Sequence, residues 1–317
     1  MNNNKIKYLI NVKSKYILNK IFGYIKEKKV LYIIHYNKFI QNRLNKNIDD
    51  FKHYFQIEIE IFPKENEYGI FINYNKNNKS YYHIYFNDNK KEIRNFINKN
   101  EKISKIRIII DNKIISLDNL FRDCRCIKKI NFNKFNRKDI NNMSHLFHGC
   151  IKLEEINFYN FNTNNVTDMS YMFYKCESLK ELNLFIFNTN KVINMSNMFQ
   201  HCSSLKQLDL SNFKTNKVTD MNSMFKECIS LLSVNVLSFN TKNVVKMKSM
   251  LESCSSIKFI DLSSFTIRKF NDTNSIFRKC KCLINIISRN NIIVKEFEIL
   301  SIHQNKDFQK LTTFNNN

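Results

Sequence analysis

Apolar positions recur with a period of 26 residues through residues 117–287 of this chain. Within each period a phenylalanine or leucine stands three residues before a cysteine, and a leucine or isoleucine stands three residues after it. Repetition at a fixed period of this length is the signature of a repeat architecture. The cysteines that mark the period are Cys124, Cys150, Cys176, Cys202, Cys228, Cys254 and Cys280.

Each repeat contains two shorter periods. Residues 182–184 alternate apolar, polar and apolar side chains, which predicts a strand buried on one face. The segment that ends at Cys176 has apolar residues at i, i+3, i+4 and i+7, which predicts a helix of about two turns. Asp168 stands where its side chain can cap that helix. The helical positions are Met169, Met172, Phe173 and Cys176.

A strand and a two-turn helix cannot bury their apolar faces alone, so successive repeats must stack on one another. Stacking places equivalent strands side by side in a parallel sheet, with neighbouring strands about 4.7–4.9 Å apart. The predicted fold class is therefore α/β, a solenoid with one strand and one short helix in each 26-residue turn.

The repeat reads Cys-x-x-Leu-x-x-Leu-x-Leu-x-x-Phe-x-Thr-x-x-Val-x-x-Met-x-x-Met-Phe and resembles the BspA-like leucine-rich repeats, which include bacterial surface lipoproteins. The resemblance covers residues 117–287, more than half of the chain. It implies a right-handed leucine-rich-repeat solenoid used for binding, adhesion or scaffolding. It implies no catalytic residue, because the family motif contains none.

The residues before the repeats lack the 26-residue period. Residues 14–47 predict two or three helices, residues 56–62 a strand, residues 68–74 and 80–86 a hairpin, and residues 105–110 the first strand of a sheet. We therefore expect an N-terminal helical and β cap domain at 1–110, a leucine-rich-repeat solenoid at 111–290, and a C-terminal cap and tail at 291–317.

Residues 16–25 and 30–39 also resemble the F-box, a helical module that docks Skp-family adaptors of cullin ubiquitin ligases. The opening Leu-Pro of F-boxes is absent, so the resemblance rests on apolar spacing. The alternative is that the same residues form only the core of the cap. The residues that would dock an adaptor are Ile17, Ile21, Phe22, Ile25 and Leu31.

The formal net charge of +23 attracts nucleic acids and acidic partners through its summed field. Residues 1–123 carry a net charge of +11 and the remainder +12, and this even spread favours a compositional origin over a specific nucleic-acid surface. No secretory signal and no apolar segment of 18 residues is recognised, so we expect a cytoplasmic protein with reduced cysteines and no membrane span.

Motifs for catalysis, cofactors and metals are not found in the sequence. The pairs Cys124-x-Cys126 and Cys280-x-Cys282 lack zinc-site spacing, and three glycines provide no phosphate-binding loop. His145 and His148 lie close to Cys150, but sister repeats replace both histidines. The periodic cysteines are most simply small buried apolar residues. We therefore expect no cofactor, no metal site and no enzymatic activity.

Two columns of residues on the predicted sheet face are candidates for partner binding. One column is polar and the alternative for it is a structural ladder of side-chain hydrogen bonds. The other varies between polar and large apolar residues, which are plausible anchors for a protein partner. The candidates are Asn157, Asn183 and Asp209 in the polar column and Tyr159, Phe185 and Leu237 in the variable column.

The sequence therefore supports a leading hypothesis and two alternatives. The leading hypothesis is a non-enzymatic interaction or scaffold protein that binds a partner protein on the sheet face of its solenoid. The first alternative is an F-box-like substrate adaptor of a cullin ubiquitin ligase. The second alternative is a surface adhesin.

Overall fold

The computed structural model describes residues 9, 12–25, 29–30, 33–34, 37–46, 53–88, 90–92, 94–267 and 272–304. The chain divides into two separately packed units, Met1–Gln56 and Ile57–Asn317. Residues 57–110, which the sequence analysis groups with the N-terminal helices, pack with the repeats in the second unit.

The first unit contains the helices α2 (Lys15–Tyr24) and α4 (Lys38–Leu44). The side chain of Ser14 accepts a hydrogen bond from the Ile17 N–H group at 3.3 Å and begins α2. The side chain of Asn37 does the same for Ile40 at 3.0 Å and begins α4. Apolar residues at helical spacing form the core of this unit: Leu9, Leu18, Phe22, Val30, Ile33, Ile34, Ile40 and Leu44.

The second unit begins with a mixed sheet that leads directly into the repeats. Its strands are β1 (Ile57–Pro63), β3 (Tyr82–Phe86), β4 (Lys90–Glu92), β6 (Ile106–Ile110), β7 (Ile127–Phe135) and β8 (Glu155–Asn157). They lie in the order β4-β3-β6-β1-β7-β8, and the pairing changes from antiparallel to parallel between β7 and β8. The strands expected at 56–62 and 105–110 are confirmed.

The expected hairpin of residues 68–74 and 80–86 is wrong. Strand β2 (Gly69–Ile70) pairs with β5 (Phe96–Ile97), and β3 pairs with β4 and β6. Between β2 and β3 the chain forms the 3-10 helix η2 (Lys76–Tyr81). Alternating apolar residues identified the strands, but the pairing partners lie farther along the chain.

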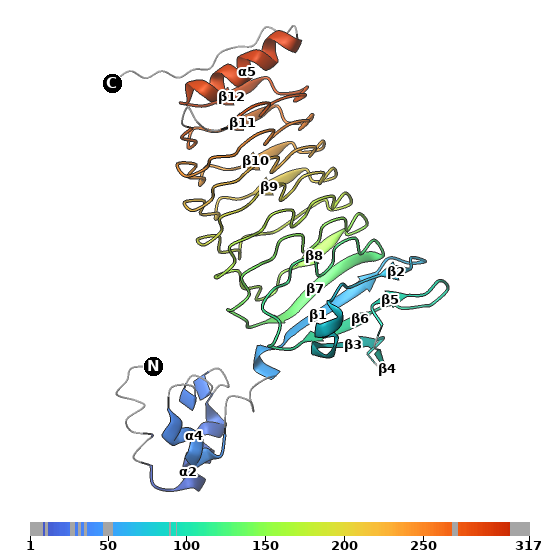
Figure 1. Ribbon diagram of the computed structural model, residues 1–317, viewed down its shortest axis with the longest axis vertical. Coiled ribbons are helices and arrows are strands. Elements are labelled where there is room, and N and C mark those ends of the chain that lie inside the picture. Colours follow the sequence, from blue (N-terminus) through green and yellow to red (C-terminus); the bar gives the residue numbers. More distant parts are fainter. Residues whose placement is uncertain are drawn as a thin grey trace. The chain divides into compact units, whose positions relative to one another are not determined.

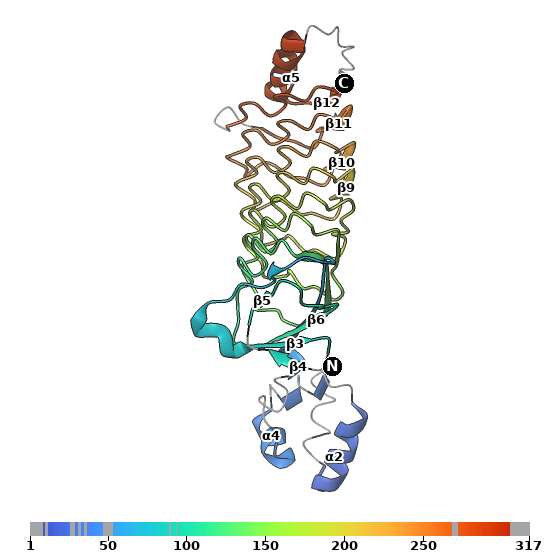
Figure 2. The ribbon, with the colours of Figure 1, turned by 90° about the vertical axis from the view of Figure 1, so that its right-hand side faces the viewer.

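Equivalent residues of successive repeats lie side by side. Strand β9 (Gln207–Asp209) pairs in parallel with β10 (Ser233–Asn235), and β11 (Phe259–Asp261) pairs in parallel with β12 (Asn285–Ile287). Single parallel bridges join residues 26 positions apart, from Ser116 and Asn142 onward to Lys246 and Asp272. The strands follow one another along this unit, and the helix α5 (Asn291–Gln304) covers the last repeat (Figures 1 and 2). The fold is thus mixed α/β, with parallel strand pairing and few helices among the described residues.

The third repeat departs from the predicted strand pattern. Residues 180–183 form no strand, and Leu182 is half-buried, whereas Leu184 is buried. The parallel pairing is therefore interrupted between β8 and β9. It is interrupted again between β10 and β11, which belong to separate strand pairs.

The predicted two-turn helix before each cysteine is wrong. Residues 170–175 form successive turns, and Tyr171 and Lys175 have φ angles of 55° and 56°. Such left-handed residues end an α-helix. The backbone N–H groups of Tyr171, Phe173 and Lys175 donate to carbonyl groups of the next repeat, each at 2.9 Å. The helix-like spacing of apolar residues therefore belongs to turns whose hydrogen bonds run between repeats.

The residue expected to cap the helix has a related role in these turns. Asp168 Oδ1 accepts a hydrogen bond from the Ser170 N–H group, two residues farther on, at 2.8 Å. Lys246 occupies the equivalent position in a later repeat, and its ammonium group cannot accept a hydrogen bond. There the Lys248 N–H group donates to Asn222 Oδ1 of the preceding repeat at 2.8 Å. The turn is thus closed by a side-chain acceptor even where its own repeat lacks one.

Side chains form ladders through the interior of the repeats. The rings of Phe173 and Phe199 stack with centroids 5.6 Å apart, and Phe199 and Phe225 stack at 5.7 Å. The buried Thr189 hydroxyl donates to the Lys214 carbonyl at 3.0 Å and accepts from the Lys214 N–H group at 2.7 Å. Each ladder position is therefore completed by the neighbouring repeat.

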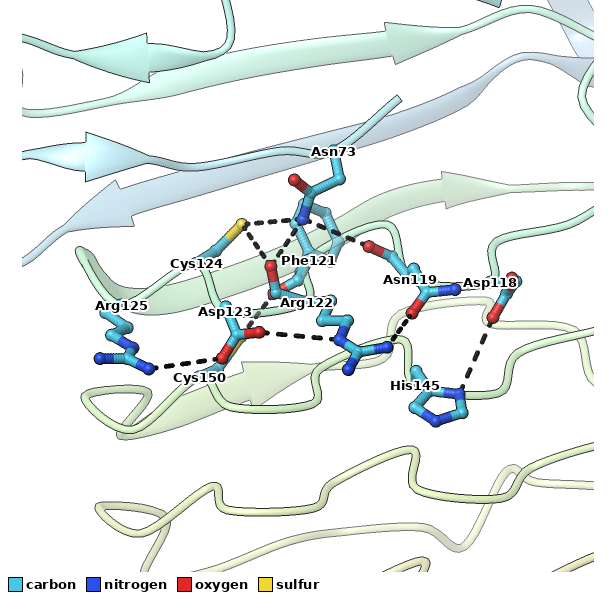
Figure 3. A network of polar contacts seen from close by, with 10 residues as sticks. All are labelled: Asn73, Asp118, Asn119, Phe121, Arg122, Asp123, Cys124, Arg125, His145 and Cys150. Atoms are coloured by element: carbon cyan, nitrogen blue, oxygen red, sulfur yellow. Dashed lines mark hydrogen bonds and ion pairs between the residues drawn. The ribbon is translucent and has the colours of Figure 1, made fainter. Parts of the chain in front are cut away.

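The first repeat has no preceding repeat, and Asn73 supplies the missing donors (Figure 3). The Asn73 backbone N–H group donates to the Leu120 carbonyl at 2.7 Å. Its side-chain amide donates to the Arg122 carbonyl at 2.6 Å. In later repeats these two carbonyl positions accept backbone N–H groups of the preceding repeat, as Leu146 accepts from Phe121 at 2.9 Å. At the opposite end, Glu296 of α5 accepts the Ser275 N–H group at 3.2 Å.

We expect Asn73→Asp to lower the free energy of unfolding of the repeat unit by about 1–3 kcal/mol. The substitution replaces an amide donor by a carboxylate oxygen that faces carbonyl groups. Thermal and urea unfolding monitored by circular dichroism would measure the loss. Asn75→Asp is the matched control, because the Asn75 side chain acts as an acceptor for the Asn77 N–H group and an aspartate preserves that bond. Equal stability of the two variants would contradict this role for Asn73.

Candidate functional site

The six candidate residues of the sheet face lie in two adjacent columns. Tyr159, Phe185 and Leu237 are 70%, 77% and 53% exposed. The polar candidates Asn157, Asn183 and Asp209 are also exposed, as is Asn235, which stands two positions before Leu237 in the same polar column. Three large apolar side chains are thus exposed in one column, which is interrupted by Ser211 between Phe185 and Leu237. The outward orientation expected from the sequence agrees with these exposures.

The polar column holds the variable column in position. Asn183 Oδ1 accepts a hydrogen bond from the Phe185 N–H group at 3.0 Å, and Asn235 Oδ1 accepts from Leu237 at 3.3 Å. Asp209 accepts from the Ser211 N–H group at 3.0 Å. A side chain that bonds the backbone two residues on fixes a tight turn. The polar residues therefore fix the backbone from which the exposed apolar side chains project.

The alternative of a side-chain ladder between repeats applies at one position. The Asn157 side-chain amide donates to Asn131 Oδ1 of the preceding repeat at 2.9 Å. It also donates to Glu155 at 2.9 Å. For Asn183 and Asp209 the hydrogen bonds given above are local to their own turns.

Two shallow hollows lie on the sheet face where the strand pairing is interrupted. One is lined by residues 180–184, which include Asn183, and by Lys206, Gln207, Asp209 and Leu232. The other has a volume of about 310 Å³ and is lined by β9, β10, Leu237 and β11. Gln207 and Asp209 line both hollows, which therefore adjoin. Tyr159 and Phe185 do not line either of these two hollows.

Sequence reasoning missed two exposed apolar residues beside these hollows. Leu232 is 51% exposed and lines one hollow, and Phe259 is 46% exposed and lines the other. In the first four repeats, lysine, glutamate or glutamine stands at the corresponding positions, as at Lys180, Glu181, Lys206 and Gln207, and Ser233 precedes Phe259 in the fifth. The change from charged or polar residues to apolar ones was visible in the sequence. It could not be interpreted from the sequence alone, because only the structure shows that these positions face outward.

The residues proposed to dock an adaptor divide between surface and core. Ile17 is 51% exposed, whereas Phe22 is 4% exposed and belongs to the core of the first unit. Ile21 and Ile25 are half-buried and pack against that core. Leu31 lies outside the described residues. Among the described candidates, Ile17 is therefore the best placed to contact a partner.

The periodic cysteines form a ladder of buried thiols. The Cys202 thiol donates to the Phe173 carbonyl of the preceding repeat at 3.1 Å, and Cys228 donates to Phe199 at 3.0 Å. Burial raises the pKa of the Cys228 thiol to about 12, so it remains protonated and able to donate at neutral pH. All nine cysteines of the chain are free thiols, and Cys282 is exposed. The cysteines therefore link neighbouring repeats through hydrogen bonds, and the interpretation as buried packing residues is sharpened.

In the turns that precede the periodic cysteines, two histidine side chains of the second repeat stack on two tyrosine side chains of the third. His145 stacks on Tyr171 with ring centroids 4.7 Å apart, and His148 stacks on Tyr174 at 4.5 Å. Figure 3 shows His145 Nδ1 directed towards Asp118, 3.9 Å from its carboxylate. Within the described ranges, no group of three or more potential metal-ligating side chains is brought together. These histidines serve as stacking partners between repeats.

The pKa of His148 falls to about 4, mainly because burial disfavours the charged ring and also because the Arg122 guanidinium adds positive charge nearby. Its Nδ1 atom is buried without a hydrogen-bond partner. Burial also lowers the pKa of His145, with Arg122 as the second cause. Both rings are therefore neutral in the folded protein at pH 7.

No helix in the described part of the chain combines the length and apolar character needed to cross a membrane. A family model described as "Mycoplasma protein of unknown function, DUF285" matches residues 115–233 and 206–317. The two matches together cover more than half of the chain and all seven periodic cysteines. No curated protein and no solved structure matches the chain significantly. The repeat-family prediction is confirmed, while the BspA-like and F-box-like resemblances stay predictions.

We expect native alkylation to modify Cys282 rapidly and the eight buried cysteines slowly. Protonated, buried thiols are poor nucleophiles, whereas Cys282 is exposed. Intact-mass analysis after a short exposure to iodoacetamide should show one adduct, and unfolding in guanidinium should give nine. Cys282→Ser should abolish the rapid adduct. Rapid labelling of the periodic cysteines in native buffer would contradict the thiol ladder.

Acid should destabilise the repeats partly through His148. Because its folded pKa of about 4 lies below the ordinary value of 6.5, the unfolded chain binds a proton first as the pH falls. The stabilisation is complete above about pH 6.5 and is lost as the pH falls towards 4. Melting temperatures measured across this range should fall less for His148→Gln, which introduces the residue found at Gln200 in a sister repeat. Parallel pH profiles for the two proteins would exclude a contribution from His148.

Proposed function

The chain belongs to the DUF285 family, and from this premise we propose that it is a non-enzymatic protein-interaction or scaffold protein. Its 26-residue repeats would form a leucine-rich-repeat solenoid that binds a partner protein on the sheet face. The proposal is compatible with a repeat family whose model is described without a function. The protein would act inside the cell, where its free thiols remain reduced.

The observation that carries the proposal is the exposed column of Tyr159, Phe185 and Leu237. Full burial of a large apolar side chain contributes roughly 1.5–3 kcal/mol. Tyrosine and other aromatic side chains are also frequent anchors of protein interfaces. The turns closed by Asn183 and Asn235 hold the backbone at two of the anchors before a partner binds, which reduces the entropy lost on binding.

An extended protein surface suits this face better than a small ligand. The two adjoining hollows are shallow and run across several repeats. Small-molecule sites, by contrast, are enclosed clefts that bury most of the ligand. The apolar residues Leu232 and Phe259 at their edges extend the surface beyond the three anchors. A partner that covers this area would contact side chains from several repeats at once.

The test is quantitative affinity purification with wild-type protein and a Tyr159→Ala, Phe185→Ala variant. We expect the variant to lose a specific protein partner while its melting temperature stays within about 2 °C of wild type, because both side chains are exposed. The matched control is Ile193→Ala, Val245→Ala, which removes two side chains that are 47% and 55% exposed outside these columns. Equal recovery of the partner by all three proteins would refute binding through the sheet face.

The affinity purification also tests the first alternative, and cell-surface labelling tests the second. Recovery of a Skp-family protein, abolished by Ile17→Asp, would favour an F-box-like adaptor that holds its substrate on the repeats. Ile17 is preferred over the half-buried Ile21, because a charge at Ile21 would disturb the core of the first unit. Labelling of the protein on intact cells by a membrane-impermeant biotin reagent would favour a surface adhesin.

A further inference from the structure

When the chain is divided between Gln56 and Ile57, where the two packed units meet in the sequence, the net charge is unevenly distributed. Residues 1–56 contain 12 Lys/Arg and 3 Asp/Glu, a net charge of +9, whereas residues 57–317 contain 39 and 25, a net charge of +14. The first unit is less than a fifth of the chain and carries more than a third of the excess charge. If the chain is divided at residue 123 instead, this basic unit is combined with the nearly neutral residues 57–123. The net charges of the two parts, +11 and +12, are then almost equal.

The described part of the first unit presents basic side chains and no acidic ones. Its charged residues are Lys13, Lys15, Lys20, Lys29, Lys38, Arg43 and Lys46. Such an excess of one sign creates a positive potential that attracts polyanions. Because the charge resides on a separately packed unit, it does not depend on the repeats.

Exposed aromatic rings lie among these cations. Tyr16 is 72% exposed, Tyr24 84% and Phe39 52%. The Lys20 ammonium lies 5.9 Å from the centroid of the Tyr16 ring, and the Arg43 guanidinium lies 5.5 Å from that of Phe39. The side chains of Tyr16 and Phe39 thus remain more than half exposed, although a basic side chain lies beside each ring.

Contacts between the helices join the two cation–aromatic pairs into one surface. Arg43 of α4 donates a hydrogen bond to the Lys13 carbonyl, just before α2. Tyr16 follows in the first turn of α2, and Lys20 lies one turn later on the same face. The opposite face of α2 carries Leu18 and Phe22 into the core. Phe39 and Arg43 of α4 are therefore joined through Lys13 to Tyr16 and Lys20 of α2, with a basic residue beside each ring.

We propose that this basic aromatic surface of the first unit binds single-stranded nucleic acid without sequence preference. Positive side chains would contact the phosphates, and the rings of Tyr16 and Phe39 would stack on bases, which are accessible in a single strand and covered in a duplex. The exposed rings are separated by cations instead of forming one continuous apolar face, which favours a nucleic-acid strand over a lipid bilayer. This function is additional to protein binding on the sheet face.

The test measures binding of the full chain to a fluorescently labelled oligothymidylate of about 15 nucleotides by anisotropy. We expect binding that weakens steeply between about 50 and 200 mM salt, with a slope of about −0.7 for each phosphate contacted. The single strand should bind more tightly than a duplex of the same length, and polyglutamate of matched charge should compete poorly because it has no bases to stack.

Two double variants separate charge from stacking. Lys15→Glu, Lys20→Glu should weaken binding at least tenfold at low salt and reduce the magnitude of the salt slope by about 1–2. Tyr16→Leu, Phe39→Leu keeps apolar side chains but removes the rings, so it should weaken binding about fivefold or more and leave the salt slope unchanged. Helical content measured by circular dichroism should match wild type, because all four residues are exposed.

The matched control is Lys214→Glu, Lys217→Glu, which makes the same change of net charge on exposed lysines of the repeats. It should bind the oligothymidylate within about twofold of wild type. Equal losses for the two lysine variants would show attraction by total charge and overturn the proposal. Unchanged affinity of the leucine variant, or equally tight binding of the duplex, would also overturn the proposal. Binding of the protein to phosphatidylserine vesicles but not to the oligonucleotide would overturn it as well.

Discussion

The repeats depend on backbone hydrogen bonds that run from each repeat to the next. In the segment before each periodic cysteine except the last, alternate N–H groups donate to carbonyl groups 25 residues farther along the chain, as Tyr171 does to Ser196. A helix would satisfy those donors locally, but here the neighbouring repeat must be present. Left-handed residues make this possible, because they turn the N–H group out of the local path and towards the next repeat. Stability is therefore shared between neighbours, and no repeat can bury its backbone alone.

This constraint explains the side chains that recur in the interior. The buried thiol of Cys202 and the buried hydroxyl of Thr189 donate to carbonyl groups of adjacent repeats at 3.1 and 3.0 Å. It also explains the ends of the array. Asn73 supplies donors where no repeat precedes, and Glu296 supplies an acceptor where none follows. The array ends where side chains replace the missing neighbours.

Residues whose side chains are not needed for contacts between repeats are available for binding. On the sheet face, polar residues such as Asn183 close turns, and the residue two positions later can vary from Ser211 to Phe185 without disturbing the interior. In the first unit, the core of Leu18 and Phe22 leaves the outward face of α2 free to carry rings and cations. The two proposed binding functions thus use separate surfaces with different chemistry, one apolar and one basic and aromatic.

The sequence by itself determined the repeat length, its register and the buried positions, because a period of 26 residues with Cys, Leu and Phe at fixed places permits few ways of stacking. It also identified Tyr159, Phe185 and Leu237 as outward residues, since alternation places neighbouring side chains on opposite faces. It could not determine that residues 170–175 form turns, because apolar spacing is the same whether hydrogen bonds run within a segment or between repeats. Nor could it place the boundary at Gln56 or assign Asn73 its role, because both depend on contacts between residues far apart in the chain, which only the tertiary structure brings together.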